Sequence, residues 1–112
     1  MASEHTAKAF DTDLQELTRL VAEMGGLAER MITDSVDALV RRDVALSKRV
    51  VANDVEIDRL QHLIEERAVL TIARRQPMAV DLREIVSAMR VAVDLERIGD
   101  LAKNMGKRVA AL

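Results

Sequence analysis

Apolar residues recur every three or four positions along most of the chain, and they fall into three long segments. In the first segment, about residues 9–41, steps of four and three alternate without a break. That spacing is typical of a helix packed against other helices. Its apolar seam consists of Phe10, Leu14, Leu17, Val21, Met24, Ala28, Met31, Ser35 and Ala38. The pair Gly25–Gly26 lies in the middle of this helix and predicts close packing against a neighbouring helix, or else a kink or a site where a partner backbone approaches.

The second segment, about residues 43–75, also has helical spacing. Its stripe consists of Leu46, Val50, Ile57, Leu60, Ile64, Ala68 and Thr71. Asp43 is a good N-cap for this helix, because its carboxylate can accept hydrogen bonds from the first free backbone N–H groups. Asn53–Asp54 could start a fresh helix and leave a short extra helix at about 43–52. The pattern leaves both the split and the continuous helix open.

The third segment, about residues 78–110, follows the clearest boundary in the chain. Gln76 precedes Pro77, and a residue before proline avoids the α region. Two apolar stripes lie on nearly opposite sides of the predicted helix: Leu82, Val86, Met89 and Val93 in its first half, and Val91, Leu95, Ile98, Ala102, Met105 and Val109 in its second. Either the helix changes its packing partner along its length, or the second stripe is a surface for another subunit or domain.

Three amphipathic helices of about 30 residues with short connections must run up, down and up. The sequence therefore predicts an all-α fold, an antiparallel three-helix bundle over residues 9–112 preceded by a flexible N-terminal tail at 1–8.

Composition narrows the class of function. The chain has 112 residues, 49% hydrophobic and 32% charged, with a net charge of −2, which argues against a strongly basic nucleic-acid binder. It has no cysteine, so disulfides and thiolate metal sites are excluded. It also has no apolar run of about 18 residues and no signal-peptide pattern, so we expect no membrane span and a cytoplasmic location.

Two pairs of carboxylates stand out. Glu96 and Asp100 continue the first stripe of the third helix, one turn apart on one face, and Asp54 and Asp58 form a similar pair on the second helix. The two helices run antiparallel about Pro77, which places both pairs at similar heights. Four converging carboxylates would attract positive charge, and their oxygens suit hard cations. Alternatively, the nearby cations Arg97, Lys103 and Lys107 neutralise the acids without a metal.

The acidic segment also resembles a known family. Residues 95–100 read Leu-Glu-Arg-Ile-Gly-Asp, which is similar to a signature of the PhoU family of bacterial phosphate-signalling accessory proteins. Further segments agree in order and spacing: Glu23–Gly26, Lys48–Val50 followed by Asp54 and Asp58, Arg75–Pro77, and Asp81–Arg83. The resemblance covers about residues 10–107.

This resemblance implies a fold, a site and partners. Family members consist of three-helix bundles whose acidic motifs can bind metal clusters, and those motifs map onto Asp54 with Asp58 and onto Glu96 with Asp100. The cofactor implied is iron, zinc, manganese or magnesium. Members act as negative regulators of the phosphate-starvation response and connect the phosphate transporter, through its ATPase subunit, to a sensor histidine kinase. They are not established enzymes.

One departure affects what the chain can do alone. Family members typically carry two tandem bundles, whereas this sequence has the length of one. A homodimer or a second repeat is therefore expected to cover the second stripe. Two other functions stay open: a helical oligomerisation module without a ligand, and a carboxylate-bridged metal-binding bundle. The latter usually uses Glu-x-x-His pairs, but here Glu66 is followed at the third position by Val69.

Overall fold

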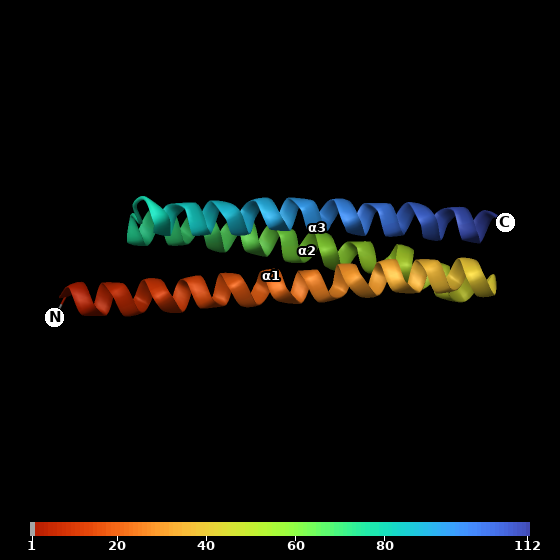
Figure 1. Ribbon diagram of the computed structural model, residues 1–112, viewed down its shortest axis with the longest axis horizontal. Helices are drawn as coiled ribbons and strands as arrows, with labels where there is room; N and C mark the ends of the chain where they lie inside the picture. Colours follow the sequence, from red (N-terminus) through yellow and green to blue (C-terminus); the bar gives the residue numbers. More distant parts are fainter. Residues whose placement is uncertain (1) are drawn as a thin grey trace.

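A computed structural model describes the backbone of residues 2–112 and the side chains of residues 7–112. It contains helices α1 (Ala2–Arg41), α2 (Val44–Arg75) and α3 (Val80–Ala111). They lie side by side as an antiparallel bundle that measures 62 × 18 × 16 Å (Figure 1). The predicted all-α, up-down-up fold is confirmed. In the described part of the chain, no helix is long and apolar enough to cross a membrane.

Helix α1 begins earlier than the sequence pattern indicated. The helix starts at Ala2, so the tail expected at residues 1–8 is helical from Ala2 onward, while Met1 lies outside the described residues. Three alanines and the absence of glycine and proline from residues 2–9 favour the helix. The first turns extend past the connection between α2 and α3 (Figure 1).

The connection between α1 and α2 is a tight reversal. Arg42 adopts a positive φ of 54°, and the Asp43 N–H donates to the Ala38 carbonyl at 2.9 Å. The Asp43 side chain accepts a hydrogen bond from the Leu46 N–H at 3.0 Å, which confirms the predicted N-cap. Helix α2 then continues without interruption through Asn53–Asp54, so the possible short extra helix at 43–52 is wrong.

The connection between α2 and α3 needs two unusual backbone conformations. Gln76 is left-handed, and its N–H caps α2 by donating to the Ile72 carbonyl at 3.0 Å. Ala79 also has a positive φ of 50°. Helix α3 begins at Val80, so Pro77 lies in the turn before the helix.

The core confirms the seams predicted for α1 and α2. Leu17, Met24 and Met31 of α1 are fully buried, and they belong to one core cluster with Ile57 and Ile64 of α2. The structure adds Leu20 and Leu27 to the α1 seam, and Ser47 and Asp54 to the α2 seam.

The seam of α3 differs from the two predicted stripes. It is a single row with alternating steps of three and four, made mostly of small residues: Ile85, Ala88, Ala92, Leu95, Gly99, Ala102, Gly106 and Val109. Leu95, Ala102 and Val109 of the predicted second stripe belong to this seam. Val91 and Ile98 of that stripe are exposed, as is Leu82 of the first. The glycines permit close packing: a Cβ on Gly106 would lie 2.9 Å from the Ser47 carbonyl oxygen of α2.

Candidate metal-binding site

The structure brings the two predicted acidic pairs together on adjacent helices. Asp54 and Asp58 belong to α2, and Glu96 and Asp100 belong to α3. Ile57 and Gly99 lie within these pairs in the sequence, and they meet in space: a Cβ on Gly99 would lie 3.1 Å from Ile57 Cγ2. The acids therefore surround a close contact of α2 and α3 that depends on the absence of a side chain at Gly99.

Asp54 is the most enclosed of the four acids, with 6% of its surface exposed. Its Oδ2 accepts a hydrogen bond from Lys103 Nζ at 3.2 Å, which forms an ion pair between α2 and α3. Its Oδ1 is buried and has no hydrogen-bond partner among the residues that the structure describes. Glu96 and Asp58 are half-buried, whereas Asp100 is exposed. A buried carboxylate oxygen without a partner leaves an acceptor open to a further donor or cation.

The cluster carries more negative than positive charge. Burial raises the pKa of the Glu96 carboxyl, and the charges of Asp100, Asp58 and Asp54 raise it further. The pKa of the Lys103 ammonium is raised, first by its hydrogen bond to Asp54 and then by attraction to that carboxylate. Lys103 therefore stays charged, and the acids around it still favour additional positive charge.

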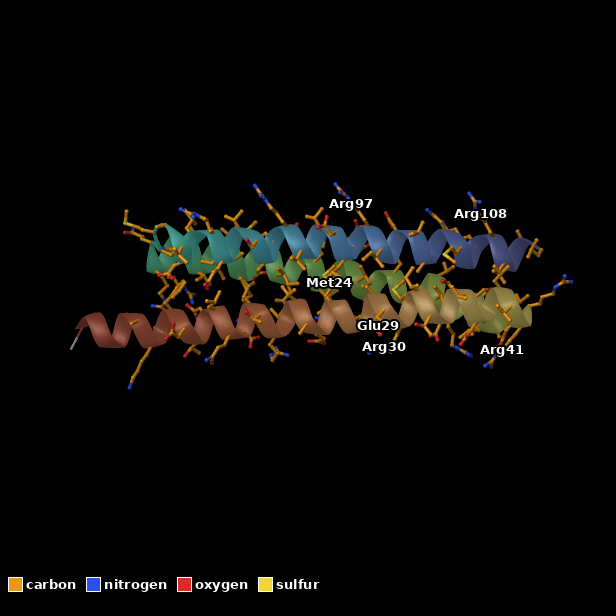
Figure 2. The ribbon with its side chains drawn as sticks, in the orientation of Figure 1. Met24, Glu29, Arg30, Arg41, Arg97 and Arg108 are labelled. Carbon is orange, nitrogen blue, oxygen red and sulfur yellow. The ribbon has the colours of Figure 1, made fainter. Side chains whose placement is uncertain are left out.

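Only one of the cations expected to neutralise these acids reaches them. Lys103 contacts Asp54, while Arg97 pairs instead with Asp94 at 3.8 Å. The Arg97 side chain points outward from α3 (Figure 2). Lys107 makes no ion pair within residues 7–112. Sequence spacing placed Lys103 near the acids, but its choice of Asp54 depends on how α3 is rotated against α2.

The donor chemistry of the cluster fits a hard cation, because the cluster consists of four carboxylates and one of their oxygens, Asp54 Oδ1, is buried without a partner among the described residues. Across residues 7–112, however, no three acidic or histidine side chains are spaced closely enough to hold an ion as they stand. Binding a metal would require side-chain rotation within the cluster. The Lys103 ammonium provides the positive charge beside Asp54 in this arrangement.

Two hollows near the α2–α3 connection were not anticipated from the sequence. A cavity of about 470 Å³ lies between the start of α1 and the turn after α2, where Phe10, Arg75 and Pro77 line it. A polar hollow of about 320 Å³ beside it is lined by Asp13, Arg67 and Arg74, among others. Arg75 Nε pairs with Asp13 Oδ2 at 2.9 Å and so joins α2 to α1 at this end.

Comparisons with known proteins agree with the fold and with the family that the sequence resembles. The family model described as "PhoU domain" matches residues 21–109. The phosphate-specific transport system accessory protein PhoU homolog of Rhizobium meliloti is 54% identical over 112 residues, covering 100% of this chain and 47% of its own length. The homolog of Caulobacter vibrioides is 49% identical over 110 residues, covering 98% of this chain and 48% of its own.

A solved structure extends the likeness to three dimensions. The crystal structure of PhoU from Pseudomonas aeruginosa superposes with a TM-score of 0.89 at 39% sequence identity. The match covers 92% of this chain and 49% of that chain. The chain therefore spans about half the length of the relatives it matches.

Proposed function

Because the chain belongs to the PhoU family, we propose that it contributes to the regulation of phosphate transport, as one bundle of an accessory protein. The observation that carries this proposal is the agreement over residues 21–109 with the family, together with 54% identity to an accessory protein of the phosphate-specific transport system. The role we propose is regulatory rather than enzymatic.

We further propose that the chain acts as an adaptor, a negative regulator that contacts the ATPase subunit of the phosphate transporter and a sensor histidine kinase. Two features support this role. The bundle is 62 Å long, so it offers well-separated surfaces for two partners. Large apolar side chains are exposed on all three helices, including Val40, Val55 and Leu101, and such positions can be buried by partner proteins.

A capture experiment tests the adaptor role. The immobilised chain should retain both the purified ATPase subunit and the cytoplasmic part of the kinase, with affinities in the micromolar range or tighter. An unrelated transporter ATPase serves as the control and should not be retained. Failure of both specific partners to bind, while the chain keeps its helical circular-dichroism spectrum, would contradict the proposal.

The outer side between α1 and α3 is our proposed surface for a second bundle, which a homodimer would supply. Val91 and Ile98 are 43% and 39% exposed on α3, and Val36 is 43% exposed on α1. Light scattering should give the mass of two chains. A mass of one chain at all concentrations would contradict the homodimer. If the chain is a dimer but captures neither partner protein, the result would favour the alternative function, a helical oligomerisation module without a ligand.

We also propose that Asp54, Asp58, Glu96 and Asp100 together bind a metal cation, such as iron, zinc, manganese or magnesium. The unpartnered Asp54 Oδ1 and the raised pKa of Glu96 support it. Purified without added metal, the chain should carry near-stoichiometric metal by plasma mass spectrometry, and Glu96→Ala/Asp100→Ala should lose it.

The matched control for that measurement is Asp94→Ala, which removes an exposed carboxylate from the same helix and should keep the metal. Equal metal content in the parent and in the double variant would place the metal elsewhere. Absence of metal from the parent, even after incubation with these ions, would contradict the proposed site.

A further inference from the structure

We propose that Lys103 is the resident counter-ion of the acidic cluster, and that a metal cation binds there only by displacing the Lys103 ammonium from Asp54. This inference rests on the proposed metal binding, and it adds a residue that regulates the same site. Lys103 would set the affinity of the cluster for cations without itself being a ligand.

The first step is the position of the ammonium. Lys103 Nζ lies 3.2 Å from Asp54 Oδ2, and the side chain of Asp54 is only 9% exposed. A metal ion that used this carboxylate would approach its oxygens to about 2.0–2.6 Å. Asp54 Oδ1 is open, but an ion on it would lie beside the ammonium held by Oδ2 of the same carboxylate, and the two positive charges would repel each other.

The second step is that the two cations would depend on the same acids. Lys103 Nζ forms its ion pair with Asp54, which is one of the four acids that the metal would need. A cation that neutralises these groups therefore removes the attraction that keeps Lys103 in place.

The third step is that Lys103 is free to leave. Its side chain is 29% exposed, so the ammonium can swing into solvent on its four-carbon stem. The only hydrogen bond that the ammonium makes to the described residues is the one to Asp54. Within residues 7–112 no other cation forms an ion pair with an acid of the cluster, so Lys103 alone would have to move.

Titration with Mn²⁺ by isothermal calorimetry tests this competition. The variant Lys103→Met keeps the length of the stem and removes the charge, so it should bind Mn²⁺ at least tenfold more tightly than the parent. Lys103→Arg keeps the charge and should stay within about threefold of the parent. Lys107→Met removes a cation one turn further along α3 that has no described ion pair, and it should also leave the affinity unchanged.

The outcomes separate the inference from the metal proposal. If the parent binds Mn²⁺ and Lys103→Met binds it equally or more weakly, the competition is wrong and the metal site stands. If neither the parent nor Lys103→Met binds Mn²⁺, both proposals are wrong.

Thermal unfolding gives a second readout. Metal-free Lys103→Met should melt at a lower temperature than the parent because Asp54 loses its partner, and Mn²⁺ should raise the melting temperature of the variant more than that of the parent.

Discussion

Replacing Ile57 with alanine should lower the free energy of unfolding by about 2–5 kcal/mol, because it opens a cavity in a fully packed region. Ile57 has no exposed surface, and it lies in the core cluster that joins the three helices. Denaturation with urea, followed by circular dichroism, measures the change. Val55→Ala is the control on the same helix: Val55 is 74% exposed, so its truncation should change stability by no more than about 0.5 kcal/mol.

The close contact of Ile57 with Gly99 predicts that substitutions at these two positions have coupled effects on the free energy of unfolding. In the parent, an alanine Cβ at position 99 would lie 3.1 Å from Ile57 Cγ2, so part of the gain in helix propensity is lost to crowding. In the Ile57→Ala background that crowding is gone, and Gly99→Ala should stabilise the protein by about 1 kcal/mol. A double-mutant cycle in which the two effects simply add would show that Gly99 does not accommodate Ile57.

The size of the buried residues explains which helix faces could be predicted from the sequence. Helices α1 and α2 are packed through large residues such as Met24 and Ile64, whose spacing indicates their buried faces directly. On α3 the buried positions include Ala92, Gly99 and Gly106, which carry little hydrophobic signal. The spacing therefore includes Val91 and Ile98 in the second stripe, but the structure leaves these two exposed. The other members Leu95, Ala102 and Val109 lie in the seam.

The candidate site also has a part that could be predicted from the sequence and a part that could not. The acids could be found from the sequence, because one-turn spacing and the antiparallel direction about Pro77 determine their approximate heights. The pairing of Lys103 with Asp54 could not, since it depends on the rotation of α3 about its axis and on how closely α2 approaches. The early start of α1 at Ala2 was also missed, because the first turns lack the apolar periodicity used to recognise a helix.

Helix α3 packs closely against α2 at Gly106, so we expect Gly106→Ala to lower the free energy of unfolding by about 1–3 kcal/mol. The added Cβ would lie 2.9 Å from the Ser47 carbonyl oxygen and 3.2 Å from Val51 Cγ2. A backbone carbonyl cannot move aside as a flexible side chain can, so the two helices would have to separate at this end. Urea denaturation should show a lower transition midpoint with the same dependence on denaturant.

Gly26→Ala is the matched control, because it makes the same substitution in the middle of another long helix. An added Cβ there would meet only Arg30 Nη1, at 3.6 Å, the end of a flexible side chain. Its expected effect has the opposite sign, a gain of up to about 1 kcal/mol from helix propensity. The fold thus contains glycines with different roles: Gly106 permits helix contact within the bundle, while close packing within the chain does not require Gly26. If both variants stabilise the protein equally, close approach is not the reason that α3 carries glycine at position 106.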